Sequence, residues 1–208
     1  ARRNAENGFR EIVDDTKRRA AQATAEAAAN HFIPRAINDR STSKSAREVL
    51  TSFWTGKGPR HFEYGQNSEP ARELLAADPG GFFQAQIDAM AAYMAQRDRT
   101  PYLRDGQQVT NWRGKKFGAF KDVMGLGNGA QIGDVVGSMR WEAVVKDGML
   151  HVRATNKTTL ESFSIENRLR HGLVTSPDAG RFSPVTQTFT FVVPIPEKYR
   201  APKKVSKK

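Results

Sequence analysis

Hydrophobic and polar residues alternate most regularly between residues 139 and 156. Asp147 and Gly148 form the pair that two-residue type I′ turns favour, because both turn positions need a positive φ. Such a turn fixes the pairing of two antiparallel strands. Since side chains alternate along a strand, one face is predicted to carry the apolar residues Met139, Trp141, Ala143, Val145, Leu150, Val152 and Ala154. The charged residues then lie on the other face, which is typical of a half-buried hairpin.

Apolar residues in the first part of the chain recur at helical spacing instead. An alanine-rich run is predicted to form a helix that ends at Pro34, because proline disfavours helix at the residue before it. Its inner stripe is expected to comprise Phe9, Ile12, Val13, Ala20, Ala23, Ala27 and Phe32. A polar linker follows at residues 38–43, and a short helix capped by Ser45 is predicted to end at Thr55.

Two further helices are predicted before residue 100. Asn67 or Ser68 caps the first of them, which should bury Leu74 and Leu75. The second is expected to run to about Arg97, with an inner stripe of Phe83, Ile87, Met90, Ala91 and Met94. Residues 60–65, which follow a glycine-rich break, are interpreted as a loop.

Beyond residue 100 the chain is rich in glycine and in strand-forming residues. Besides the hairpin, residues 185–193 alternate in the manner of a half-buried strand that ends at Pro194. The sequence therefore predicts an α+β fold, in which a helical N-terminal half packs on a small antiparallel β-sheet in the C-terminal half. Three segments are expected, namely an alanine-rich helical lead at residues 1–40, an α+β domain at residues 41–196 and a basic disordered tail at residues 197–208.

Composition argues against several classes of protein. No run approaches the roughly 20 apolar residues that a membrane-spanning helix needs. The chain has no cysteine, which excludes disulfides, thiolate zinc sites and cysteine nucleophiles. Its four histidines are scattered without metal-ligand spacing, and the GxSxG pattern of serine hydrolases is absent. Neither a metal nor a cofactor is therefore expected.

The net charge of +11 is large for 208 residues. Part of it lies in the lysine-rich tail, and a second basic stretch follows Trp112 at Arg113, Lys115 and Lys116. These three residues are candidates for nucleic-acid binding. Basic surface favours polyanionic partners, namely RNA, an anionic membrane surface or an acidic protein, although solvated surface lysines would give the same composition.

The polar face of the predicted hairpin holds the best candidates for chemistry. The turn places Arg140, Glu142, His151 and Arg153 on it, with Glu142 opposite Arg153. A carboxylate base, a histidine acid and arginines for the phosphate suffice to cleave RNA through its 2′-hydroxyl without a metal. The alternative is an ordinary solvated face with a stabilising cross-strand ion pair.

A second candidate cluster lies in the expected loop. His61, Glu63 and Tyr64 are close in sequence, and functional residues concentrate on loops. A histidine and a glutamate two positions apart carry little specificity, so a surface cluster explains them equally simply.

The order of short phrases resembles a known class of protein. SFWTGKGPRHFEYG, ELLAADPGG, IGDVVGSMRWEAVVKDG and QTFTFVV follow a basic alanine-rich lead, over about residues 45–195. This layout is similar to the C-terminal toxin modules of bacterial polymorphic toxins, of Rhs or colicin-like type, although the HNH-like histidine cluster of colicin nucleases is missing. The resemblance implies an antibacterial effector in bacterial competition, delivered by a larger upstream carrier into a target cell and neutralised by a cognate, acidic immunity protein.

Three functions remain open at this point. The chain could be a toxin that acts on a cytoplasmic target, with RNA as the substrate. It could instead perturb the inner membrane, or it could be a non-catalytic domain that binds nucleic acid or a partner through its basic residues.

Overall fold

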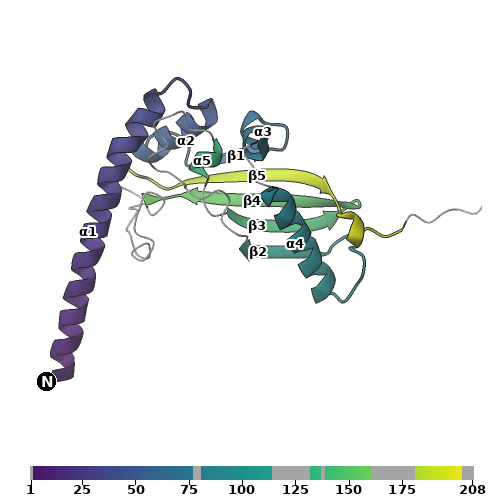
Figure 1. The fold of residues 1–208 in the computed structure, drawn as a ribbon, viewed down its shortest axis with the longest axis horizontal. Helices are drawn as coiled ribbons and strands as arrows, with labels where there is room; N and C mark the ends of the chain where they lie inside the picture. Colours follow the sequence, from purple (N-terminus) through teal and green to yellow (C-terminus); the bar gives the residue numbers. More distant parts are fainter. Residues whose placement is uncertain (1, 77–80, 114–131, 137–138, 161–180, 203–208) are drawn as a thin grey trace, which may run out of the picture. The chain divides into compact units, whose positions relative to one another are not determined.

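The computed structural model describes residues 2–76, 81–113, 132–136, 139–160 and 181–202 of the chain (Figure 1). It divides into two compact units. The first comprises Ala1–Phe62, Phe120–Val135 and Lys157–Thr186, and the second comprises Glu63–Ala119, Val136–Asn156 and Gln187–Lys208. The helices are α1 (Arg2–Asn38), α2 (Lys44–Thr55), α3 (Glu69–Ala76), α4 (Phe82–Arg97) and the short α5 (Ile132–Val135).

The strands are β1 (His61–Gly65), β2 (Gln108–Arg113), β3 (Met139–Lys146), β4 (Met149–Thr158) and β5 (Val185–Pro194). They form one sheet in the order β1-β5-β4-β3-β2. The predicted α+β layout is confirmed. The sheet is mixed rather than purely antiparallel, because three hydrogen bonds, one between backbone groups and two with a side-chain partner, each join a residue of β5 to the residue 126 positions earlier, in or beside β1. A constant offset of this kind is the pattern of parallel neighbours.

The hairpin of β3 and β4 has the predicted register. Trp141 pairs with Ala154, Glu142 with Arg153 and Val145 with Leu150. Both turn residues have a positive φ, as a type I′ turn requires, with 53° at Asp147 and 70° at Gly148. The turn therefore decides which side chains share a face, as the sequence indicated.

Helix α4 packs on the apolar face of this hairpin (Figure 1). The ring centroid of Phe83 lies 5.8 Å from that of Trp141 and 4.7 Å from that of Phe191. Trp141 is fully buried, and the whole predicted inner stripe of α4 is buried with it. We call this side of the sheet the covered face.

Strand β2 contains a bulge that changes which residues face α4. Val109 pairs with Ala143, but Trp112 pairs with Trp141, so β2 holds one extra residue between them. Asn111, in the bulge, has a φ of 55°. The extra residue turns Trp112 toward α4, where its Nε1 donates to Gln86 Oε1 at 3.2 Å. A regular strand would have placed Trp112 on the opposite face.

The predicted end of the first helix is wrong. α1 continues through Pro34 to Asn38, and Asp39 N still donates to Arg35 O at 2.9 Å. Proline removes only one hydrogen bond, while Ile33 and Ala36 on either side of it are fully buried. Helix α1 is in contact with α2 of the same unit, and the burial of these two residues favours helix on both sides of the proline.

The expected inner stripe of α1 is also wrong. Ile12 is 66% exposed, and Ala20, Ala23 and Ala27 are exposed as well. The buried positions are Ala21, Ala25, Ala28, Ala29, Ile33 and Ala36. Alanine occurs all round this helix, so periodicity alone does not select the buried side, which tertiary packing decides. The side chain of Phe9 lies outside the described part.

Three local predictions need correction, and one is confirmed. Ser43 rather than Ser45 caps α2, because its Oγ accepts from Ala46 N at 3.3 Å. Residues 61–65 form β1 rather than a loop, since β5 supplies hydrogen-bonding partners. Leu74 is buried, but Leu75 is 37% exposed. Ser68 caps α3 as predicted, accepting from Ala71 N at 3.3 Å.

The expected basic tail begins with ordered structure. Glu197–Tyr199 form a 3-10 turn in the second unit, and Tyr199 O accepts a hydrogen bond of 2.9 Å from Leu103 N. The four lysines at the end of the tail lie outside the described residues.

Candidate functional site

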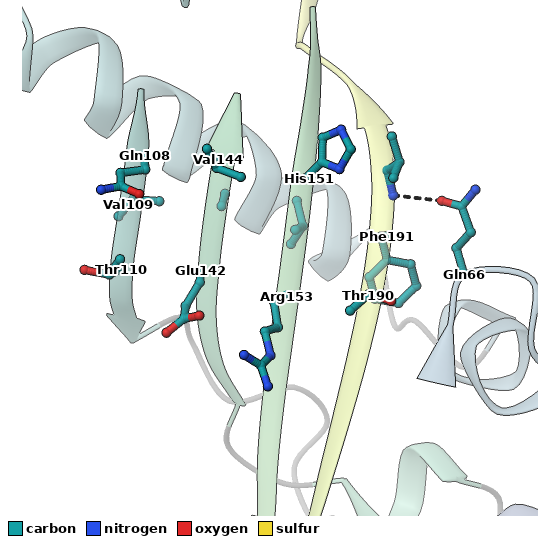
Figure 2. A pocket seen from close by; sticks show the side chains of 13 residues that line it. Gln66, Gln108, Val109, Thr110, Glu142, Val144, His151, Arg153, Thr190 and Phe191 are labelled. Carbon is teal, nitrogen blue, oxygen red and sulfur yellow. Dashed lines mark hydrogen bonds between the residues drawn. The ribbon is translucent and has the colours of Figure 1, made fainter. Parts of the chain in front are cut away.

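The side of the sheet away from α4 carries the predicted chemical groups, and we call it the open face. Within the second unit its side chains are Gln108, Thr110 and Arg113 of β2, Arg140, Glu142, Val144 and Lys146 of β3, His151, Arg153 and Thr155 of β4, and Thr190 and Val192 of β5. Figure 2 looks onto this face, with α4 behind the strands. The prediction that Arg140, Glu142, His151 and Arg153 share one face is confirmed by the register.

A hollow of about 490 Å³ lies over the middle of the open face. Glu142, His151 and Arg153 all line it, together with the amides of Gln66 and Gln108 and the hydroxyl of Thr110. Val144 and Val192 contribute apolar surface. Gln66 is held in place because its Oε1 accepts from Val192 N at 2.7 Å (Figure 2). The hollow therefore combines a carboxyl group, an imidazole and a guanidinium with neutral polar groups.

The strand register sets the spacing of the three charged or titratable groups. Glu142 lies directly opposite Arg153, whereas His151 lies opposite Val144. His151 is consequently the diagonal neighbour of Glu142, and diagonal neighbours in antiparallel strands are about 7–8 Å apart. A small group bound in the hollow could thus lie between the carboxylate and the imidazole.

Glu142 and Arg153 do not neutralise each other. Although the two residues are opposite, no ion pair joins them within 4.0 Å, and neither side chain makes a hydrogen bond with another residue that the structure describes. Figure 2 shows the carboxylate and the guanidinium extending separately from neighbouring strands. The cross-strand ion pair between Glu142 and Arg153 that their register allows is not formed.

A second pair on the open face carries like charges. Arg113 and Arg140 are direct partners in the β2–β3 register, and both are exposed. Like charges at directly opposite positions destabilise a sheet. Arg140 lies two residues before Glu142 in β3 and does not line the hollow. The structure thus brings Glu142, His151 and Arg153 together and places Arg140 beside them with Arg113.

The alternative cluster is divided by its strand. In β1, Tyr64 is 8% exposed and packs against Phe189 on the covered face, with ring centroids 5.0 Å apart. His61 and Glu63 are not buried with it, because side chains alternate along a strand. The three residues therefore do not form one site. Lys115 and Lys116, the other predicted nucleic-acid contacts, lie outside the described residues.

Sequence reasoning missed the residues that β2 and the segment after β1 contribute. Gln66, Gln108 and Thr110 line the hollow but belong to no recognisable motif. The bulge in β2 breaks the alternation that would have revealed a strand there, so the only available signal was the isolated pair of Val109 and Trp112.

Neither metal ligands, membrane-spanning helices nor similarity to known proteins adds a further assignment for the described residues. No group of three or more histidine, aspartate or glutamate side chains that could hold a metal ion occurs in the described ranges. None of the helices described here combines the length and apolarity needed to cross a membrane. The chain matches no protein-family model, no curated protein and no solved structure with which it was compared.

Proposed function

We propose that the open face binds RNA and cleaves it by attack of a 2′-hydroxyl group, without a metal ion. One observation supports this above the others, namely that Glu142, His151 and Arg153 line one hollow and that no hydrogen bond or ion pair joins them to one another or to another described residue. Groups kept apart in this way remain available to a substrate. The basic residues around them favour a polyanion.

The reaction we propose uses each group once. The Glu142 carboxylate accepts the proton of the 2′-hydroxyl as its oxygen forms a bond to phosphorus. The bond from phosphorus to the 5′-oxygen breaks, and protonated His151 donates its proton to that leaving oxygen. Arg153 stabilises the negative charge on the remaining phosphate oxygens. The products are a 2′,3′-cyclic phosphate and a 5′-hydroxyl, and no other reactant is consumed.

The diagonal spacing suits this chemistry. The attacking and leaving oxygens lie on opposite sides of phosphorus in an in-line displacement, so a base and an acid must approach from two sides. Each must come within about 2.6–3.2 Å of its oxygen. Neighbours about 7–8 Å apart on a sheet leave room for a phosphate between them.

The wider role we propose is that of an antibacterial toxin domain. Its resemblance to polymorphic toxin modules supports delivery into a target cell by a larger carrier, with action in the cytoplasm. The basic open face would suit an acidic immunity protein as well as RNA. A non-catalytic RNA-binding domain is the second candidate, because the exposed pair of Arg113 and Arg140 would serve binding without cleavage.

The direct test is to incubate the purified chain with RNA in the presence of EDTA. We expect fragments that end in a 2′,3′-cyclic phosphate. Glu142→Gln and His151→Ala should each lower the cleavage rate by about 10²–10⁴-fold, the usual contribution of one acid or base. His31→Ala, which removes an exposed histidine of α1, is the matched control and should cleave normally. Unchanged cleavage by His151→Ala would refute the mechanism.

A cellular experiment separates the three candidate functions. Expression in the bacterial cytoplasm should arrest growth and degrade RNA, and Glu142→Gln should relieve the arrest. Export to the periplasm should be harmless for a ribonuclease but toxic for a protein that perturbs the inner membrane, so membrane potential should be followed in both cultures. Normal growth with soluble protein, together with RNA binding in vitro, would favour the non-catalytic candidate.

A further inference from the structure

The pair of Arg113 and Arg140 needs an explanation that the reaction itself does not provide. The two residues are direct partners across β2 and β3, and both side chains are exposed. Neither guanidinium makes a hydrogen bond or an ion pair with a described residue. A sheet that keeps two like charges opposite each other gives up stability, unless an anion lies between them. Two guanidinium groups can bind one phosphate through several charge-assisted hydrogen bonds.

The bulge in β2 is what creates this pair. In a regular strand, Arg113 would share a face with Val109, which is buried on the covered side. The extra residue between Val109 and Trp112 moves Arg113 to the open face, opposite Arg140. Bulges often redirect a side chain beside a functional site.

The order of residues along β3 shows on which side of the hollow the arginine pair lies. Arg140, Glu142 and Val144 follow one another on the open face, and His151 lies opposite Val144. Arg140 is therefore on the Glu142 side of the hollow, away from His151. In the proposed reaction Glu142 serves the attacking nucleotide and His151 serves the leaving nucleotide. The pair is thus placed on the side from which the attacking nucleotide enters.

We propose that Arg113 and Arg140 form a second phosphate subsite, which binds the phosphate on the 5′ side of the attacking nucleotide. The assignment of this phosphate to the 5′ side, and not the 3′ side, rests on the proposed RNA cleavage. The substrate class that this subsite implies is single-stranded RNA. An RNA strand must extend across the open face for one phosphate to lie at Arg153 and the neighbouring phosphate at Arg113 and Arg140.

The test uses dinucleotides with a single cleavable linkage, which fixes the register of the substrate. We would compare one dinucleoside monophosphate without terminal phosphates, with a 5′-phosphate and with a 3′-phosphate. The 5′-phosphate should raise kcat/KM about tenfold, as expected for one set of charge-assisted hydrogen bonds, and the 3′-phosphate should have much less effect. Arg113→Gln and Arg140→Gln should each remove most of the gain from the 5′-phosphate.

Two variants distinguish a subsite from a general effect of charge. Arg113→Lys keeps the charge but loses the planar fork of donors, so it should retain only part of the gain. Lys146→Gln removes one exposed positive charge from the same strand and face, at the other end of β3, and should retain the whole gain. An equal gain from the 5′- and 3′-phosphates, or a full gain in Arg113→Gln, would overturn the proposal.

Binding of analogues that cannot react separates this inference from the proposed cleavage. Dinucleotides with a 2′-deoxy attacking nucleotide should bind more tightly with a 5′-phosphate than with a 3′-phosphate, and Arg113→Gln should abolish the difference. This result supports the subsite even if the RNA dinucleotides are not cleaved. Equal binding of the two analogues by the wild-type protein overturns the subsite, even if RNA is cleaved.

Discussion

The covered and open faces of the β3–β4 hairpin consist of alternate residues of the same two strands. They differ in whether their side chains find packing and hydrogen-bonding partners within the described structure. On the covered face, Trp141, Val145 and Leu150 are almost completely buried, and the buried amide of Asn156 donates to Gln187 Oε1. The Trp141 indole N–H is an exception, because it makes no hydrogen bond in the described structure. On the open face, opposite charges remain unpaired and two arginines are neighbours.

In this hairpin, residues that pack in the core therefore alternate along each strand with residues that are candidates for ligand binding. The covered face has packing partners within the protein, whereas the charged groups of the open face make no hydrogen bond or ion pair with the described residues and are proposed to bind a ligand. Substitutions at neighbouring positions should therefore have different effects, on folding at one residue and on ligand binding at the next.

The largest effect should come from the centre of the covered face. Trp141→Ala removes a fully buried ring that Phe82 and Phe83 contact, and should lower the free energy of unfolding by about 3–5 kcal/mol. Chemical denaturation monitored by circular dichroism measures this. Arg153→Ala on the open face should change stability by less than about 0.5 kcal/mol. Similar losses in both variants would contradict the separation of the faces.

The turn that assigns residues to the two faces should give the next effect. Gly148→Ala should cost about 1–2 kcal/mol, since φ is 70° there and side chains rarely adopt that conformation. Crowding adds nothing, because no atom lies within 4 Å of the position of an added Cβ. Gly65→Ala is the matched control, as Gly65 is equally open and its φ is not positive. Thermal unfolding should show a loss only for the first variant.

Removing charge from the open face should slightly stabilise the protein. Arg113→Gln ends the repulsion from Arg140, so the free energy of unfolding should rise by about 0.2–1 kcal/mol. Added salt should reduce the gain, because it screens exposed charges. Urea unfolding at low and high ionic strength tests both points. A loss of stability would mean that Arg113 makes a stabilising contact within the protein, and it would contradict the prediction that the repulsion from Arg140 destabilises the fold.

The smallest effect is expected beside the sheet, where α4 ends near β2. Hydrogen bonds from Arg97 and Gln107 hold the pKa of Asp98 below its usual value. A carboxyl group with a lowered folded-state pKa stabilises the fold above its unfolded pKa of about 3.8, and this contribution disappears as the pH falls further. Asp98→Asn should therefore weaken the fold slightly at neutral pH and no longer do so in acid. The melting temperature measured across this range checks the sign.

Local sequence signals predicted the hairpin well because two independent rules agree there. The Asp-Gly turn fixes the register, and the alternation of apolar and charged residues requires the same register. The inner stripe of α4 was also correct, since its large apolar residues occur on one side only. From these two elements the position of Glu142, His151 and Arg153 on a shared face followed directly.

Features that depend on distant partners could not be predicted. The end of α1 beyond Pro34 depends on packing against α2, and β1 needs β5 before it becomes a strand. The pairing of Arg113 with Arg140 depends on a single extra residue in β2, which pattern analysis does not detect. The absence of an ion pair between Glu142 and Arg153 likewise needed side-chain geometry, since the register alone favours one.

The position of β5 between β1 and β4 has a consequence for the order of folding. β3 and β4 can pair as soon as their turn forms, but the hydrogen-bonding partners that join β1 to the sheet are 126 residues apart. Such distant contacts form late, because closing a long loop costs more conformational entropy. During synthesis, Tyr64 must remain without Phe189 until β5 emerges. A chain stopped before Val185 could hold the hairpin, but not the wall of the hollow formed by Thr190 and Val192, so the proposed site would be completed only when almost the whole described chain has been made.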